Sequence, residues 1–406
     1  GEVSYAGGPD GMFPATELAG SLKELGISLR RFKTGTPARV LRSSIDFTDL
    51  EVQKGDEPVT PFSFDAEMPP KNSAVCYVSW TNDRTKQVIL DNIHRSPLYA
   101  GMIEGVGPRY CPSIEDKIMR FSEKPRHQLF IEPCGAETEE MYLQGMSSSL
   151  PEEVQIALYR TVPGLENCEF MRTAYAIEYD CINSRQLRAT LEFKAIEGLF
   201  SGGQFNGSSG YEEAAVQGFM AGKEGIVRDR SKAYIGVLID DLVTKESHEP
   251  YRMMTSRAEY RLLLRQDNAD LRLSGIGHEI GLIDDERYER VLRKEQQIRE
   301  EVERLNRTPV GATHEVQECL KSYGSTELKT GSTLAELVRR PELSYEAVKE
   351  IDPKRPVLDW DVAEQVNINI KYEGYIKRQL QQVAQFKKME SRKLDESFDY
   401  STVKSL

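Results

Sequence analysis

Residues 198–215 read GLFSGGQFNGSSGYEEAA, and this stretch contains the most distinctive loop of the sequence. Apolar runs over residues 187–200, where we predict a strand, precede a group of closely spaced glycines, and an alanine-rich segment follows them. Glycine adopts left-handed backbone conformations and places no Cβ in the way of a ligand. A helix that begins near Gly210 would direct its free N–H groups and the positive end of its dipole toward the loop. The stretch therefore predicts a strand–loop–helix unit of an α/β fold.

This arrangement also predicts a binding site for an anionic group, such as a pyrophosphate or the N1/O2 edge of a reduced flavin. The amides of Gln204 and Asn206 are suited to hydrogen-bond a ring without adding charge. In the alternative interpretation, the loop is a plain turn and both amides bond its own backbone. A second glycine pattern, at Gly275, Gly277 and Gly281, is one residue too long for a dinucleotide fingerprint and follows a charged region. We predict a loop and a helix cap there.

Farther from the loop, the residue pattern divides the chain into an α/β body and a helical extension. Apolar runs at 75–80 and 128–132 predict strands. From about residue 245 onward the strand signals fade, and apolar positions three and four residues apart predict a helix over 284–307. Residues 362–390 predict a second long helical region, and the polar residues 395–406 are expected to fray.

The composition is that of a globular protein, with 39% hydrophobic and 29% charged residues among 406. No apolar run approaches the ~18 residues of a membrane span. A net charge of −12 argues against nonspecific nucleic-acid binding by the whole surface, although it is compatible with a local basic groove. Six scattered cysteines without a CxxC pair indicate reduced thiols in a cytosol-like compartment and no metal site, although spacing alone does not exclude a bridge. The first residue is Gly1 rather than Met, so we expect the natural beginning to be absent.

Five segments carry a resemblance to a known family. They are KTGTP at 33–37, GVGPRYCPSIEDK at 105–117, YAIEYD at 175–180, TSRAEYR at 255–261 and the glycine loop. With these segments the sequence resembles, over essentially its whole length, the MnmG (GidA) family of FAD-dependent enzymes that modify the wobble uridine of certain tRNAs. The resemblance implies an α/β flavoprotein with a glutathione-reductase-like FAD domain, incomplete here, a mixed α/β insertion domain and a C-terminal α-helical domain.

The resemblance also implies domain boundaries. Residues 1–33 and 186–232 would belong to the FAD-binding domain, 34–185 to an insertion domain of NAD-binding type, and 233–406 to a truncated helical domain. Family members begin with a Rossmann unit that carries the motif GxGxxG, which this sequence lacks. They also continue into a further helical module associated with a partner GTPase. The sequence is therefore expected to be a section of a longer protein.

The implied reaction adds a (carboxymethyl)aminomethyl group at C5 of the uridine. It uses FAD and NADH, takes a one-carbon unit from methylenetetrahydrofolate and an amine from glycine or ammonia, and depends on the GTPase MnmE. The resemblance further implies a cytoplasmic homodimer that forms a heterotetramer with MnmE, without membrane association. Two alternatives stay open, namely a folate- and FAD-dependent tRNA uracil methyltransferase and a flavin-free scaffold that binds RNA or protein.

Two sets of cofactor contacts follow from the resemblance. The FAD set consists of Gly202, Gly203, Gln204, Asn206, Gly207 and Gly210. The NAD set consists of Gly107, Arg109, Tyr110, Ser113, Lys117 and Arg120. The cations of the NAD set are suited to phosphate groups. Without the resemblance, the same segment is a polar loop that opens a helix, with Ser113 as its N-cap.

Cys111 is the candidate nucleophile. Activation of uracil at C5 commonly needs a nucleophile that adds at C6, and a thiolate suits this role. The neighbouring cation Arg109 and a helix that begins at Ser113 would both lower the pKa of the thiol. The alternative role for this cysteine is that of a small buried side chain. Asp116 is the candidate general base, and its neighbour Glu115 is an alternative that the spacing does not exclude.

Two clusters of cations are candidates for contact with tRNA phosphates. Residues 25–44 hold several cations and no acidic residue, which stands out in an acidic protein. Arginines at 257, 261 and 265 recur every fourth residue and on a helix would form one stripe, although nearby acids at 259 and 267 favour salt bridges instead. The predicted RNA contacts are Arg30, Arg31, Lys33, Arg39, Arg257 and Arg261.

Overall fold

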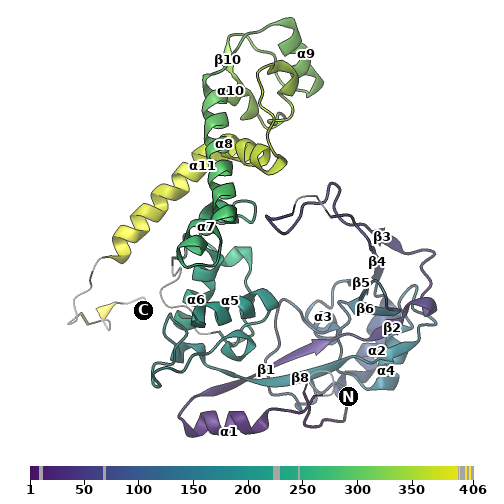
Figure 1. Cartoon of the computed structure of the whole chain (residues 1–406). Helices are drawn as coiled ribbons and strands as arrows, with labels where there is room; N and C mark the ends of the chain where they lie inside the picture. The colour runs from purple at the N-terminus through teal and green to yellow at the C-terminus, as the bar shows by residue number, and fades with distance from the viewer. Residues whose placement is uncertain are drawn as a thin grey trace. The chain divides into compact units, whose positions relative to one another are not determined.

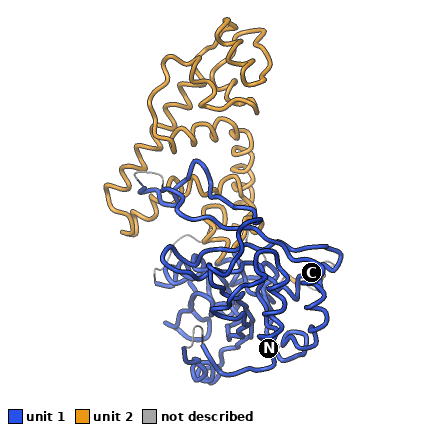
Figure 2. The backbone as a smooth tube through the Cα atoms, turned by 90° about the vertical axis from the view of Figure 1, so that its right-hand side faces the viewer, with its two compact units in different colours: residues 1–224, 239–252 blue, residues 225–238, 253–406 orange. Residues whose placement is uncertain are grey.

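The computed structural model describes residues 1–8, 12–66, 70–222, 229–245, 247–391, 393, 398–399 and 402–403. The chain divides into two compact units (Figure 2). Unit 1 comprises Gly1–Glu224 and Ile239–Arg252, and unit 2 comprises Gly225–Leu238 and Met253–Leu406. The predicted boundaries at residues 33, 185 and 232 stay predictions. Part of the predicted fraying segment, 395–406, lies outside the described residues.

Unit 1 is built on a six-stranded antiparallel sheet with the strand order β3-β4-β5-β6-β2-β7 (Figure 1). The strands are β2 Arg39–Leu41, β3 Glu51–Gln53, β4 Cys76–Trp80, β5 Gln128–Pro133, β6 Glu140–Gln144 and β7 Phe170–Arg172. Strands β4 and β5 confirm the two strands predicted from the sequence. The core of the unit joins side chains of this sheet to those of α2 Asp83–Asn92, α3 Ile114–Arg120 and α4 Glu152–Tyr159.

The glycine loop packs against a separate ribbon of two antiparallel strands. Strand β1 Leu29–Thr36 follows helix α1 Thr16–Glu24 in the chain. It pairs antiparallel with β8 Tyr175–Ile182 along its whole length (Figure 1). Because side chains alternate along a strand, Phe32 and its partner Tyr179 lie on one face of the ribbon. A Cβ added to Gly207 would lie 3.3 Å from the Phe32 ring, so this face supports the loop.

The predicted helix after the glycine loop is confirmed, but the prediction of a strand before the loop is wrong. Helix α5 spans Tyr211–Gly222, as expected for a helix that begins near Gly210. Residues 187–200 form only the isolated bridges Leu187–Phe193 and Glu192–Phe200. The reason is that Leu191 adopts a φ of 66°, which turns the chain back on itself and interrupts any extended strand.

Unit 2 is helical, and its two long helices confirm the predictions from apolar spacing. The helices are α7 Ala269–Glu279, α8 Asp285–Arg307, α9 His314–Ser322, α10 Leu334–Val338 and α11 Trp360–Glu390. The short strands β9 Pro309–Val310 and β10 Ser332–Thr333 pair antiparallel within this unit. The side chain of Asp284 accepts a hydrogen bond from the Arg287 N–H and so caps α8. Helix α6, Tyr234–Thr244, contains residues of both units.

Two expectations for unit 2 need correction. The glycine pattern at 275–281 is not a loop at Gly275 and Gly277, because α7 continues through both, but the predicted helix cap is confirmed at Gly281, which has a φ of +76° just after the helix end. A Cβ on Gly277 would lie 2.9 Å from the Ile283 side chain, so glycine permits close packing there. The arginines at 257, 261 and 265 do not share a helix, because Arg257 ends a short 3-10 turn, Thr255–Arg257, and the next helix begins at Ala269.

Within the described ranges, no helix combines the length and the apolar character needed to cross a membrane. The same part of the chain shows no group of three or more histidine, cysteine or acidic side chains that could hold a metal ion. All six cysteines are free thiols, of which Cys168, Cys181 and Cys319 are buried.

Candidate functional site

The glycine loop consists of a 3-10 turn, Gly203–Asn206, between two left-handed glycines. The φ angles are +81° at Gly203 and +77° at Gly207, and Gly210 follows with +117° at the start of α5. Side chains other than glycine rarely adopt such angles, so the three positions require glycine. A Cβ on Gly202 would lie 3.2 Å from the Gly218 N atom, which shows how closely the loop packs on α5.

The polar side chains inside the loop bond to one another. Asn206 is only 1% exposed, and its amide donates to the Ser201 carbonyl and to Gln217 Oε1, each at 2.9 Å. The Ser201 hydroxyl donates to Asn206 Oδ1 at 2.5 Å, and Gln217 donates to Ser208 Oγ at 2.7 Å. The plain-turn interpretation therefore holds for the Asn206 side chain, whose hydrogen bonds all remain within the loop and α5.

Gln204 differs from Asn206, because it lies on the exposed side of the loop. Burial raises the pKa of Tyr179 to about 12, and the nearby Gln204 amide opposes this shift. Gly202 is also exposed and has no Cβ. Gly202 and Gln204 are the members of the predicted FAD set that a flat ring could approach from outside the loop.

The end of the loop is clamped by the chain near residue 251. The Ser209 N–H donates to the Tyr251 carbonyl at 2.7 Å, and the Tyr251 N–H donates to the Gly207 carbonyl at 2.9 Å. Arg252 lies 3.4 Å from the buried carboxylate of Glu213. These contacts are not predictable from the sequence, because nothing local marks residues 251 and 252 as neighbours of a loop about 40 residues before them.

The segment that precedes α3 runs beside strand β1. Val106 forms a parallel bridge with Phe32, and the Lys33 N–H donates to the Val106 carbonyl at 3.1 Å. The Lys33 side chain covers Gly107, where an added Cβ would lie 2.7 Å from Lys33 Cε. Gly107 of the predicted NAD set therefore serves to pack this lysine.

Cys111 is exposed, so the alternative role as a buried side chain is wrong. Burial lowers the pKa of nearby Lys117, and the interaction of that ammonium with Cys111 opposes the shift. The Lys117 ammonium donates to the Gly145 carbonyl at 2.8 Å. The thiol thus lies at the surface near a half-buried cation.

The two candidate bases have different environments. Glu115 is fully buried, and its Oε1 accepts hydrogen bonds from the Ser148 hydroxyl and the Ser149 N–H, each at 3.0 Å. Asp116 accepts a hydrogen bond from the Tyr99 hydroxyl at 3.2 Å, and burial together with Asp116 raises the pKa of Tyr99 to about 12. Because Glu115 is enclosed in the core, Asp116 is the better placed of the two to meet a ligand.

Tyr110 connects the two predicted cofactor sets. Its hydroxyl is buried near Ser209 of the glycine loop without a hydrogen bond of normal geometry. Burial raises the pKa of Tyr110, and the charges that act on this group belong to Arg252, Cys111 and Glu213. The tertiary structure thereby brings the Cys111 segment and the glycine loop together, although about a hundred residues separate them along the chain.

Two further members of the NAD set have structural partners. Arg109 pairs with Glu249 at 2.7 Å while remaining largely exposed, and Ser113 caps α3 by accepting a hydrogen bond from the Asp116 N–H. Arg120 is exposed, 3.9 Å from Asp116. Arg109 and Arg120 are therefore the cations of this set that face outward.

The predicted RNA contacts of unit 1 are mostly engaged within the protein. Arg30 donates to the Ser247 carbonyl at 2.7 Å, and Arg31 pairs with Asp180 at 3.0 Å. Lys33 is only 5% exposed. The remaining unit 1 contact, Arg39, stacks on Tyr142 and lies 3.6 Å from Glu140. In unit 2, Arg257 is half-buried and Arg261 is exposed. The window 25–44 is therefore less accessible to a phosphate than its composition indicates.

Comparisons with known proteins agree with the resemblance. A family model described as "Glucose inhibited division protein A" matches residues 1–228. A second model, "tRNA modifying enzyme MnmG/GidA C-terminal helical domain", matches residues 285–380. The chain is 61% identical to "tRNA uridine 5-carboxymethylaminomethyl modification enzyme MnmG" of Caldicellulosiruptor saccharolyticus and 62% identical to the protein of that name in Lachnoclostridium phytofermentans.

The length of these relatives exceeds that of the chain. The alignments cover 100% of this chain but 66% of each relative. Among solved structures, GidA of Aquifex aeolicus in its form II crystal aligns with a TM-score of 0.82 at 42% identity, over 96% of this chain and 63% of that protein. The structural and the sequence comparisons therefore agree on GidA-like proteins.

Proposed function

This chain belongs to the MnmG (GidA) family, and on that premise we propose that it is part of an enzyme that modifies the wobble uridine of tRNA. The proposed reaction adds a (carboxymethyl)aminomethyl group at C5, with FAD, NADH and methylenetetrahydrofolate as cofactors and MnmE as partner. The observation that carries the proposal is the position of an exposed thiol, Cys111, on the segment that Tyr110 joins to the glycine loop.

Cys111 is proposed as the nucleophile that adds to C6 of the uracil ring. Addition at C6 makes C5 electron-rich, so C5 can then bond to a one-carbon unit. The Lys117 ammonium supplies a positive charge near this thiol. Asp116 is proposed as the group that holds or accepts the C5 proton, since it lies on the same short helix and is less enclosed than Glu115.

The loop residues fit a flavin edge through their backbone. Gly202 has no Cβ on the exposed side of the loop, and the Gln204 amide lies next to it. FAD supplies redox chemistry to this site when it is bound. Asn206, Gly207 and Gly210 would act indirectly, since they maintain the loop conformation. For NADH, the exposed cations Arg109 and Arg120 are the proposed phosphate contacts.

The test replaces Cys111 with serine in the intact protein, with Cys134→Ser as the matched control. Cys134 is also an exposed thiol of unit 1. We expect Cys111→Ser to lower the modification rate by at least about 10³-fold at unchanged flavin content, because serine is a far weaker nucleophile. Cys134→Ser should retain normal activity. Full modification by Cys111→Ser would remove this cysteine from the mechanism.

The mass of the modified nucleoside separates the proposal from its alternatives. A C5 methyl product would identify a uracil methyltransferase, whereas a carboxymethylaminomethyl or aminomethyl product supports the proposed activity. A colourless protein that binds tRNA without modifying it would identify a scaffold. Absorbance near ~450 nm, which is typical of oxidised flavin, distinguishes that last case before any assay.

A further inference from the structure

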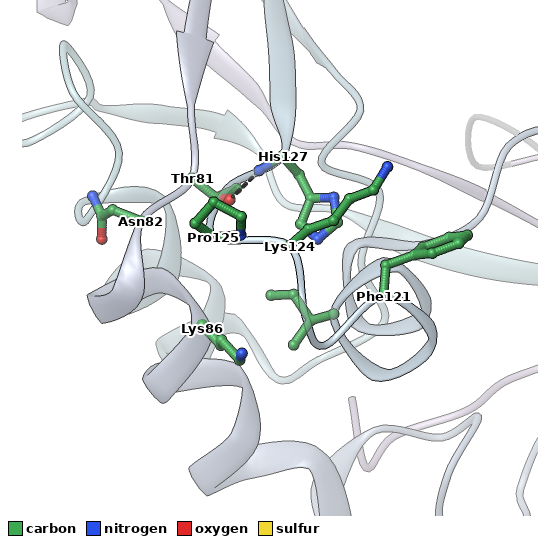
Figure 3. Close-up of a pocket in the computed structure, with 8 residues that line it drawn as sticks. Thr81, Asn82, Lys86, Phe121, Lys124, Pro125 and His127 are labelled. Atoms are coloured by element: carbon green, nitrogen blue, oxygen red, sulfur yellow. Dashed lines mark hydrogen bonds between the residues drawn. The ribbon is translucent and has the colours of Figure 1, made fainter.

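A small pocket of unit 1 lies where strand β4 ends and strand β5 begins (Figure 3). Helix α2 and the residues that follow α3 complete its wall. Its lining includes Lys86, Phe121, Lys124 and His127. The backbone there is fixed, because the Thr81 N–H donates to the His127 carbonyl at 2.9 Å and the His127 N–H donates to the Thr81 hydroxyl at 2.8 Å.

Three residues with positively charged or ionisable side chains line this pocket. The Lys86 ammonium donates one hydrogen bond to the Ser122 carbonyl at 2.6 Å and has two further N–H donors. The Lys124 ammonium lies 5.1 Å from the centre of the exposed Phe121 ring. The His127 imidazole also faces the pocket (Figure 3). Figure 3 shows the Lys86 ammonium on one side of the pocket and the Lys124 ammonium on the other, beyond His127, so cations border the pocket on two sides.

The charges around His127 show that this place is electropositive. Burial lowers the pKa of His127, and the ammonium groups of Lys117, Lys124 and Lys86 lower it further. Glu123 acts in the opposite direction. The whole chain carries a net charge of −12, so this concentration of cations is local. A site of this kind attracts an anion even on an acidic protein.

The size of the pocket limits what the anion can be. Its volume is about 10 Å³, which is room for roughly one water molecule. Pockets that enclose whole small molecules are ~300 Å³ or larger, so a nucleotide does not fit inside. One oxygen of a phosphate fits if the rest of the ligand stays outside on the surface. Phe121, which is 42% exposed, offers an aromatic face there for a ribose or a base.

We propose that the pocket of Lys86, Lys124 and His127 binds a backbone phosphate of the RNA substrate. None of these residues belongs to the glycine loop or to the Cys111 segment, so the contact would position the RNA rather than take part in the chemistry. The inference rests on the proposed function, because it takes tRNA as the ligand. An RNA chain supplies a phosphate at each nucleotide and covers enough surface to reach a shallow site of this kind.

The test measures the affinity of the intact protein for tRNA as a function of salt concentration. The double variant Lys86→Gln/Lys124→Gln removes two charges from the pocket. The matched control Lys23→Gln/Arg84→Gln removes two exposed charges of unit 1 outside it. We expect the pocket variant to weaken binding ~10-fold near 0.15 M salt and to reduce the slope of log K against log salt by about 1, as for the loss of one phosphate contact.

Several outcomes would overturn the inference. One is an unchanged salt slope in the pocket variant, and another is an equal loss of affinity in the control. A third is a raised KM for NADH with unaltered tRNA binding, which would assign the pocket to the nucleotide. If the wild type binds and modifies tRNA and the pocket variant binds tRNA with normal affinity, the inference is refuted and the proposed function is not affected. Wild-type protein without tRNA binding refutes the proposed function itself.

A second measurement does not depend on RNA. The His127 imidazole signals in the NMR spectrum give its pKa in the absence and presence of inorganic phosphate. A bound anion stabilises the imidazolium, so added phosphate should raise this pKa in the wild type and not in the pocket variant. An identical pKa in both conditions contradicts anion binding at this place.

Discussion

The glycine loop and the segment that leads into α3 belong to the same unit, yet their polar groups are used in opposite ways. In the loop, Asn206, Gln217 and their hydroxyl partners bond to one another away from solvent. In the segment, Cys111 is exposed and the buried Tyr110 hydroxyl lacks a hydrogen bond of normal geometry. The difference indicates that the loop provides a fixed shape, whereas the segment provides reactive side chains. Substitutions in the loop should therefore lower stability, and those in the segment should mainly change activity.

The largest expected effect on stability is that of Gly210→Ala. A Cβ at this position would lie 2.0 Å from Glu213 Oε2 and 2.5 Å from an Arg252 nitrogen, and φ is +117°. We expect a loss of about 3 kcal/mol in the free energy of unfolding, from backbone strain and from displacement of the Glu213 carboxylate. Chemical denaturation measures this loss. A loss below about 1 kcal/mol would show that the loop tolerates a side chain at position 210 and is not of fixed shape.

Gly218→Ala is the matched control on α5. No atom lies within 4 Å of an added Cβ there, and the residue has helical geometry. Alanine should raise the free energy of unfolding by about 0.5–1 kcal/mol, because it restricts the unfolded chain. If the two substitutions, eight residues apart, change the free energy of unfolding in opposite directions, the loss at Gly210 comes from its backbone conformation and not from alanine in general.

Asn206→Ala is expected to have the second largest effect. The substitution leaves Gln217 Oε1 and the Ser201 carbonyl without their donor in the interior, which costs about 2 kcal/mol. The nearby exposed amide provides the control, and Gln204→Ala should change stability by less than about 0.5 kcal/mol. If Gln204→Ala proved equally destabilising, the assignment of Asn206 as the structural amide would be wrong.

Tyr110→Phe tests the segment that leads into α3. Because the hydroxyl is buried without a hydrogen bond of normal geometry, its removal should leave stability unchanged or raise it by up to about 1 kcal/mol. Turnover should fall if this hydroxyl contacts a ligand between the segment and the loop. A clear loss of stability, measured by thermal unfolding, would show instead that the hydroxyl has a strong partner in the folded protein.

The smallest effect concerns the dependence of stability on pH. Burial lowers the pKa of Lys117 in the folded protein below the ordinary 10.5, so the folded state releases this proton at a lower pH than the unfolded chain does. The contribution of Lys117 to stability therefore rises as the pH increases from the lowered pKa toward 10.5. Relative to Lys117→Met, the protein with Lys117 should gain stability from pH 7 to pH 10.

This measurement is best made in a Cys111→Ser background, because the Cys111 side chain interacts with the Lys117 ammonium. A constant difference between the two proteins across that range would show that Lys117 keeps an ordinary pKa. In that case the segment would lack the perturbed cation that distinguishes it from the loop.

Local patterns were sufficient for most of the secondary structure. Apolar spacing within 284–307 and 362–390 predicted α8 and α11, because helix formation depends on neighbours three and four residues away. The strand expected over 187–200 failed, because the apolar residues there are buried through a turn at Leu191. Gly275 and Gly277 were misinterpreted for a related reason, since packing against a following residue, Ile283, was not visible in the pattern.

The basic residues show the same limit for the site. Residues 25–44 contain no acid, but Arg31 meets Asp180 on the paired strand β8, and Arg39 lies near Glu140. Conversely, the cations at Lys86 and Lys124 did not stand out along the chain, because they are separated in sequence and only the fold places both residues around one pocket. Charge along a sequence therefore predicts accessible charge poorly when strands pair across long distances.

The sequence by itself determined the family, the helix after the glycine loop and the long helices, because motifs and helical periodicity are properties of neighbouring residues. Only the tertiary structure decided which polar groups are available to a ligand. The amide of Asn206 bonds within the loop, Lys33 is covered, and Cys111 remains exposed on a segment that Tyr110 connects to the loop. The physical reason is that burial and hydrogen-bond satisfaction depend on contacts between residues far apart in the chain, which no local pattern records.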